Sequence, residues 1–149
     1  MMSLSAFVIP VLLDTNSSAD HIVRQWSRLY HYGHIYLPAL CVSTCGVYLY
    51  GAFSKKRVSG DRNEWSRYIA AAVSTIAMVP FTWLVMVPTN NTLFGLEKTA
   101  LANAEFRADR AFVRELVIKW AWMHVTRSFT PLVGAFLGFT GLLRELRAY

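Results

Sequence analysis

Three long stretches without a charged side chain constrain the fold of this chain most. Ile35–Phe53 is uncharged over 19 residues, Tyr68–Val87 over 20 and Ser128–Leu143 over 16. Because an α-helix rises about 1.5 Å per residue, the first two can cross the roughly 30 Å hydrocarbon layer of a bilayer. Backbone groups in that layer must be satisfied within the protein, which favours helices. The stretches therefore predict three membrane-spanning helices, the third of which extends into the preceding residues.

The N-terminal segment is a shorter apolar stretch. Residues 1–13 contain no charge, but they are too few to span a bilayer and lack the basic start of a signal peptide. Two interpretations stay open: a half-helix at the membrane interface, or the second half of a first spanning helix. The expected fold is an all-α, integral membrane four-helix bundle with a shortened first helix, forming a single membrane domain over residues 1–149.

The distribution of charge predicts how this bundle is oriented. The chain carries 15 Lys and Arg against 9 Asp and Glu, and its basic residues lie at the ends of the apolar stretches rather than along a nucleic-acid-binding stripe. Lys55–Arg67 and the tail with Arg144 and Arg147 are basic, so the positive-inside rule makes their side cytoplasmic. The other side then receives residues 14–34 and 88 to about 127 of this multi-pass protein.

Polar and aromatic residues from three segments are expected to meet on that other side. Glu105–Arg127 has helical periodicity, so it predicts an amphipathic extramembrane helix that leads into the last span. Trp120, His124 and Arg127 share one face of it. The other two segments contribute Asn90, Asn91, Trp26, Tyr30 and His34.

Each of these residues also has a simpler interpretation. The amides can end a helix, and Asn90 and Asn16 each begin a glycosylation sequon. The tryptophans can form an interfacial belt, and Arg127 can be an anchor that reaches the membrane surface. His31, His34 and His124 can also form a three-nitrogen metal site, although no metal-binding motif accompanies them.

Four short motifs in order resemble a known family. They are S-L-S-x-x-x-x-P at Ser3–Pro10, W-x-x-x-Y-x-x-G at Trp26–Gly33, P-T-N-N-x-L at Pro88–Leu93, and W-x-x-x-H-x-x-R at Trp120–Arg127. The set resembles the DUF1772 membrane proteins and, more narrowly, the fungal anthrone oxygenases. Members usually carry a full first spanning helix, of which this chain has about half.

The resemblance implies oxidation of an anthrone, such as emodin anthrone, at C10 to the anthraquinone. O2 is the co-substrate, no cofactor or metal is required, and the setting is polyketide secondary metabolism, with the endoplasmic reticulum as the expected membrane. His124 is the candidate base, and Arg127 with Asn90 or Asn91 would stabilise the substrate anion. Trp120, Trp26, Tyr30 and His34 would bind the flat substrate. The alternatives are a non-catalytic membrane partner of a biosynthetic enzyme and a metal-dependent membrane oxidase.

Overall fold

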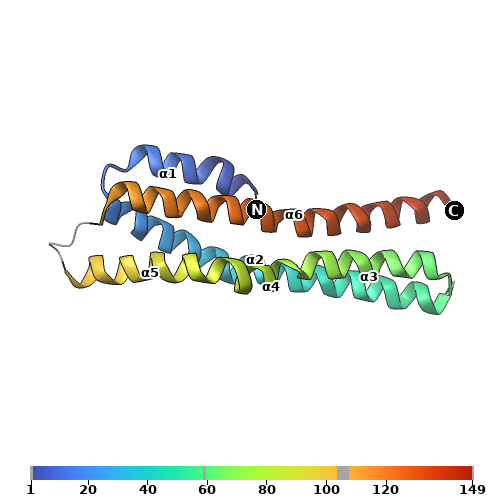
Figure 1. Cartoon of the computed structure of the whole chain (residues 1–149). Helices are drawn as coiled ribbons and strands as arrows, with labels where there is room; N and C mark the ends of the chain where they lie inside the picture. The colour runs from blue at the N-terminus through green and yellow to red at the C-terminus, as the bar shows by residue number, and fades with distance from the viewer. Residues whose placement is uncertain (1, 59, 104–107, 149) are drawn as a thin grey trace. The chain divides into compact units, whose positions relative to one another are not determined.

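The computed structural model describes residues 2–58, 60–103 and 108–148. These residues form four helical stretches and no strand (Figure 1). The first contains η1 (Leu4–Val8) and α1 (Ile9–Thr15), the second is α2 (Ala19–Val58), the third runs through α3 (Arg62–Ile76), α4 (Met78–Phe81), η2 (Thr82–Met86) and α5 (Val87–Ala102), and the fourth is α6 (Arg110–Ala148). The predicted all-α class is confirmed.

Two π-helical turns each lie just before a proline. The Ile9 N–H donates to the Leu4 carbonyl at the end of η1, and the Val87 N–H donates to the Thr82 carbonyl at the end of η2. The next residues are Pro10 and Pro88, which have no N–H to continue the regular pattern. Such π-turns are often found near functional sites, and both of these lie in segments that carry candidate site residues.

The helices extend far beyond the apolar stretches, which corrects the predicted boundaries. Residues 19–34 belong to α2, so most of the segment expected outside the membrane continues a helix. Asn90 and Asn91 lie in the first turns of α5, so the interpretation of these amides as helix terminators is wrong. Proline is favoured in a first helical turn, and Pro88 occupies that place.

The predicted helix from Glu105 begins at Arg110, and residues 104–107 lie outside the described residues.

Among the described residues, two stretches are long and apolar enough to cross a membrane: Ala19–Val58 and Arg62–Ala102. Only 11% and 28% of their most apolar windows are buried, unlike the core helices of a soluble protein. Large apolar side chains such as Tyr50 (77% exposed), Leu84 (81%) and Trp83 (73%) face outward. The third predicted span lies in the second part of α6.

The chain divides into two compact units. The first comprises Met1–Ile35 and Phe81–Thr126, and the second comprises Tyr36–Pro80 and Arg127–Tyr149. The expected single membrane domain stays a prediction, and each unit is described by itself below.

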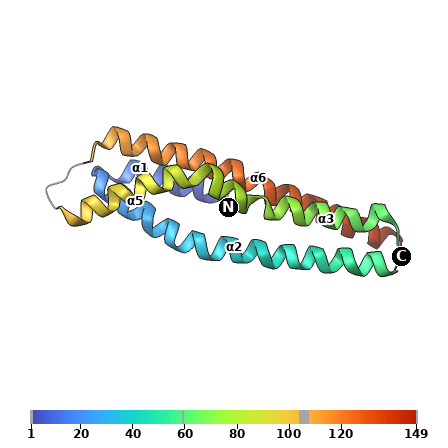
Figure 2. The ribbon, with the colours of Figure 1, turned by 60° about the horizontal axis from the view of Figure 1, so that its bottom comes forward.

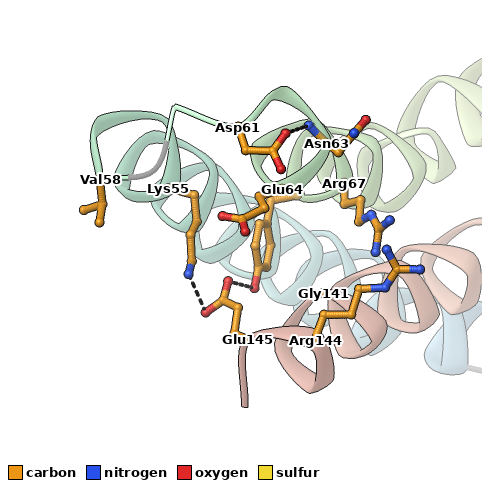
Figure 3. Close-up of a pocket in the computed structure, with 10 residues that line it drawn as sticks. Lys55, Val58, Asp61, Asn63, Glu64, Arg67, Gly141, Arg144 and Glu145 are labelled. Carbon is orange, nitrogen blue, oxygen red and sulfur yellow. Dashed lines mark hydrogen bonds and ion pairs between the residues drawn. The ribbon is translucent and has the colours of Figure 1, made fainter. Parts of the chain in front are cut away.

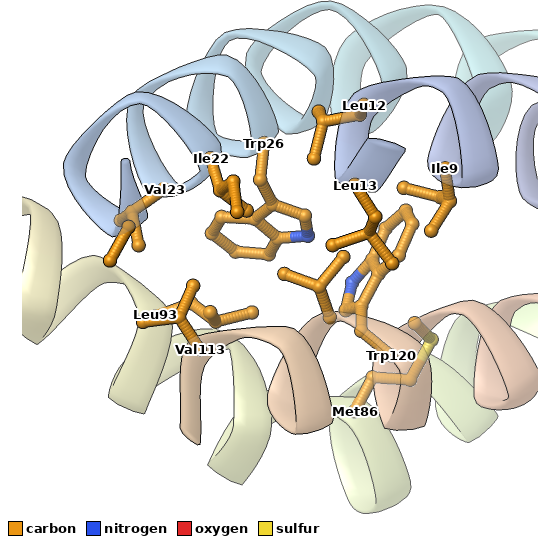
Figure 4. Close-up of a cluster of buried hydrophobic side chains, with 12 residues drawn as sticks. Ile9, Leu12, Leu13, Ile22, Val23, Trp26, Met86, Leu93, Val113 and Trp120 are labelled. Carbon is orange, nitrogen blue, oxygen red and sulfur yellow. The ribbon is translucent and has the colours of Figure 1, made fainter. Parts of the chain in front are cut away.

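The core of the first unit is a cluster of apolar side chains around two tryptophans (Figure 4). Trp26 from α2 is 0% exposed and Trp120 from α6 is 3% exposed, with ring centroids 5.9 Å apart and planes at 90°. Such edge-to-face pairs add about 0.5–1.5 kcal/mol beyond area burial. The cluster is completed by Ile9, Leu12, Leu13, Ala19, Ile22, Val23, Met86, Leu93, Val113 and Val117.

Polar contacts fasten the helices of this unit at the end where α1 meets α2. The Asn16 side chain donates to the Leu12 carbonyl at 2.7 Å and to Gln25 Oε1 at 2.9 Å. Arg110 of α6 donates to the Asn16 carbonyl at 3.2 Å. The Ser27 hydroxyl of α2 donates to Glu97 of α5 at 2.7 Å. The bonds of Asn16 hold the end of α1 against α2 and α6. Because η1 continues directly into α1, they also help to place Ser5 of η1.

In the second unit, three glycines of α6, Gly134, Gly138 and Gly141, allow close packing. A Cβ added at Gly134 would clash with Thr75 Oγ1 and lie 2.8 Å from the Ala71 carbonyl oxygen. At Gly138 it would meet the Tyr48 ring, and at Gly141 it would lie 3.3 Å from the Tyr68 ring. α3 therefore lies directly along this part of α6 (Figure 2).

Candidate active site

His124 is a buried ionisable residue of the first unit. It projects from α6, and its side chain is 1% exposed. Its Nδ1 lies 3.1 Å from the Ser5 hydroxyl oxygen of η1, and its ring stacks on Trp120 at 4.9 Å between centroids and 27° between planes. The imidazole is thus held from two sides, by a hydrogen bond and by a ring face.

The Ser5 contact is compatible with a form of this imidazole that can act as a base. When Nδ1–H donates to Ser5 Oγ, the proton of the neutral ring lies on Nδ1 and Nε2 carries the lone pair. That tautomer is the one in which Nε2 can accept a proton from a substrate. Sequence reasoning placed Ser5 in a motif but gave it no role. The signal was a serine in a segment otherwise rich in apolar residues.

Asn90 is a buried amide without a protein partner. Its side chain is 2% exposed, and neither its nitrogen nor its oxygen has a hydrogen bond within the described part of the chain. It lies four residues after Met86 and three before Leu93, so it shares the α5 face that enters the core. A buried polar group left unpaired costs about 1–3 kcal/mol, so such a group calls for an explanation other than stability.

The two buried indole N–H groups share this property. Nε1 of Trp26 and Nε1 of Trp120 are buried and have no hydrogen-bond acceptor among the described residues. Together with the Asn90 amide they place donors without acceptors in the same compact unit as His124. A ligand with several oxygen atoms could satisfy them.

The aromatic residues predicted to bind substrate fall into a buried and an exposed group. Trp26 packs against Tyr30 at 5.5 Å and Phe94 at 5.1 Å, and Tyr30 stacks on the exposed His34 at 5.4 Å and 10°. The interfacial-belt interpretation is wrong for Trp26 and Trp120, because both are buried inside the protein. A substrate can touch the Trp26 ring only if the packing around it opens.

The remaining predicted residues are not all gathered here. Asn91 is exposed on α5. Arg127 is 9% exposed but belongs to the second unit, so its role stays a prediction.

Two of the simpler interpretations fail on geometry. His31, His34 and His124 do not form a group that could hold a metal ion, and no other His, Cys, Asp or Glu group in the described residues does. The sequon asparagines Asn90 and Asn16 are 2% and 9% exposed, so neither side chain is presented for glycosylation in this fold.

A cavity of about 520 Å³ lies between α1 and α6 beside Ser5. Its size is within the usual range for small-molecule sites, roughly 300–1,000 Å³. Its lining is largely apolar and comprises Ser5, Ala6, Ile9, Pro10, Leu13, Asp14, Arg114, Ile118, Ala121, Trp122 and Val125. Ser5 lines the cavity and also contacts His124, so one residue separates the cavity from the candidate base, which does not itself line it.

Comparison with known proteins identifies the family. Residues 26–137 match the sequence profile described as "Anthrone oxygenase". The chain is 60% identical to "Anthrone oxygenase nsrD" of Aspergillus novofumigatus, over 99% of this chain and 86% of that protein. It is 48% identical to "Anthrone oxygenase dmxR16" of a Cryptosporiopsis species, over 98% and 79%, and 43% identical to "Anthrone oxygenase AgnL2" of Paecilomyces divaricatus, over 95% and 85%.

No solved structure matches the chain. The family profile nevertheless covers most of the sequence, and the relatives align with nearly all of it. The chain therefore belongs to the anthrone oxygenase family.

Proposed function

We propose that this protein is an anthrone oxygenase of a polyketide pathway, which oxidises C10 of an anthrone of the emodin anthrone type to the anthraquinone. O2 is the co-substrate, and no cofactor is required. The observation that carries the proposal is the buried His124, bonded to Ser5 and stacked on Trp120, in a chain of this family.

The substrate itself can supply the electrons that O2 needs. Removal of one C10 proton turns the anthrone into an electron-rich anthranolate. One electron passes from it to O2, the two radicals combine at C10, and the protonated base returns its proton to give a C10 hydroperoxide. Loss of the second C10 proton with cleavage of the O–O bond forms the carbonyl and releases water. One oxygen atom enters the product and the other leaves as water.

His124 is the base that we assign to the removal of both C10 protons and to the return of the first one to the peroxide. A neutral imidazole has a pKa near working pH, which suits a general base. The contact with Ser5 is compatible with the tautomer in which the proton lies on Nδ1, and the stacked Trp120 ring restricts rotation of the imidazole. A base held in one orientation needs little reorganisation when the proton moves.

Asn90 is the amide that we assign to the anthranolate oxygen. Its amide nitrogen is buried without an acceptor, whereas Asn91 is exposed, which favours Asn90 of the two predicted residues. A preorganised donor aimed at a developing oxyanion contributes roughly 3 kcal/mol where it has been measured. Arg127 remains the proposed second stabiliser on the sequence pattern alone.

The apolar surface of the protein suits a substrate dissolved in lipid. We propose a multi-pass membrane protein, in the endoplasmic reticulum of a fungus, into which the flat tricycle enters through the α1–α6 cavity. The weakly buried candidate spans and the apolar cavity lining support this placement. Once the packing around the two buried indoles opens, Trp120, Trp26 and Tyr30 would contact the rings, and the indole N–H groups would donate to substrate oxygens. His34 would lie farther out, on the exposed surface.

The proposal is tested with membranes that contain the protein, an anthrone and O2. Quinone absorbance is followed against membranes without the protein and against a parallel sample with a chelator. We expect O2-dependent quinone formation that the chelator does not change. A rate equal to that of the empty membranes would remove the oxygenase assignment for that anthrone, and loss of activity on chelation would favour the metal-dependent alternative.

The entry route is tested by filling the cavity. Ala121 lines it, whereas Ala111 of the same helix is exposed and does not. We expect Ala121→Phe to raise KM for the anthrone by about tenfold, the equivalent of about 1.4 kcal/mol of lost binding, and Ala111→Phe to leave KM unchanged. Equal KM values for both variants would contradict entry through this cavity.

A further inference from the structure

A second cavity, of about 480 Å³, lies in the second unit at the turn between α2 and α3 (Figure 3). Its walls come from the end of α2, the start of α3 and the end of α6. It is lined by Lys55, Val58, Asp61, Asn63, Glu64, Arg67, Tyr68, Gly141, Arg144 and Glu145. None of these residues belongs to the candidate active site, so this cavity needs a separate explanation.

Two carboxylates of this cavity already have partners. Glu145 forms an ion pair with Lys55 at 3.1 Å and accepts a hydrogen bond from the Tyr68 hydroxyl at 2.7 Å. Asp61 caps α3 by accepting from the Asn63 N–H at 2.9 Å. Asp61 and Glu145 therefore stabilise the turn and the meeting of α2, α3 and α6, and Glu64, the third carboxylate of the lining, also has a partner.

Two arginines of the cavity have no such partners. Arg67 of α3 and Arg144 of α6 direct their guanidinium groups toward each other (Figure 3). Within the described residues, neither forms a hydrogen bond or an ion pair. Two like charges directed at one point repel each other unless an anion lies between them. A phosphate fits that place, because guanidinium groups bind phosphate oxygens in a planar, two-pronged geometry.

We infer that Arg67 and Arg144 form a binding site for the phosphate of an anionic lipid headgroup. The choice of a lipid rests on the proposed membrane placement. Residues 55–67 and 141–149 carry seven basic and three acidic side chains, so this end of the unit attracts anions. The Lys56 ammonium lies 5.5 Å from the ring centre of Trp65. A tryptophan of this kind suits the depth of the lipid headgroups in a membrane. Basic pockets between membrane helices on the cytoplasmic side are a known mode of headgroup recognition.

The inference is tested with the purified full chain in detergent. Calorimetry measures binding of a short-chain phosphatidic acid, and a phosphatidylcholine with the same chains is the second probe. We expect the acid to bind and the choline lipid to bind at least about tenfold more weakly, because its quaternary ammonium offsets the phosphate charge and is repelled by the two arginines. Arg67→Gln and Arg144→Gln should each weaken binding of the acid by about tenfold or more.

Arg147→Gln is the matched control, because Arg147 is exposed on the same helix but does not line the cavity. It should change the affinity less than twofold, and all three variants should keep the wild-type rate of anthrone oxidation. Equal losses for Arg147→Gln and Arg67→Gln would overturn the site in favour of diffuse charge. Displacement of the lipid by millimolar inorganic phosphate, at constant ionic strength, would instead make it a site for free phosphate.

Discussion

Ser5→Ala is the change that most directly separates a positioning role from mere packing at the candidate active site. The substitution removes one hydroxyl that is 8% exposed and lies 3.1 Å from His124 Nδ1. It leaves an apolar residue of similar size in η1. The imidazole then loses its hydrogen-bond partner at Nδ1, while its stacking on Trp120 remains.

The expected magnitude follows from the hydrogen bond that is lost. An unpaired group in a buried site costs about 1–3 kcal/mol, and each 1.36 kcal/mol is a factor of ten in rate. We therefore expect kcat to fall by about tenfold to a hundredfold. KM should change little, because Ser5 positions the base and is only one of the residues that line the cavity.

The assay is the rate of quinone formation at saturating anthrone, measured across pH. Ser5→Thr, which keeps the hydroxyl, should restore most of the rate, and Ser3→Ala, at an exposed position of the same helical stretch, should behave as wild type. A Ser5→Ala enzyme with wild-type kcat and an unchanged pH profile would refute the positioning role of Ser5.

Two further predictions use neighbouring residues as controls. Asn90→Leu should lower kcat by about a hundredfold and yet raise thermal stability, because it removes a buried amide without a partner. Asn91→Leu, at an exposed site, should change both quantities little. A destabilised Asn90→Leu protein would indicate that the amide has a structural role. Gly134→Ala should destabilise the protein by about 1–3 kcal/mol through the clash with Thr75, whereas Gly46→Ala, with no atom within 4 Å of the added Cβ, should be neutral or stabilising in thermal unfolding.

The sequence predicted the helices well because their signal is local. The uncharged stretches are recognised from composition, and the glycines of α6 act through close contact at one helix face. Both could therefore be inferred without coordinates. The ends of the helices could not. Pro88 and the amides Asn90 and Asn91 are typical of the end of a helix. In this structure a π-turn precedes them, and they lie in the first turns of α5.

The candidate site was predicted in part for a similar reason. His124 and Trp120 share a helix face, and spacing alone brought them together. Ser5 lies 119 residues away from His124, and no periodicity in the sequence links the two. The difference between Asn90 and its exposed neighbour Asn91 also depends on which face of α5 enters the core, and that face is set by tertiary packing.

The central claim is that His124 removes the C10 proton of the substrate. The most direct measurement is the rate of O2-dependent quinone formation by His124→Ala relative to wild type, in membranes with matched amounts of folded protein. We expect the rate to fall by about a hundredfold or more, which is typical for a missing general base. A variant that oxidises the anthrone at the wild-type rate would contradict it.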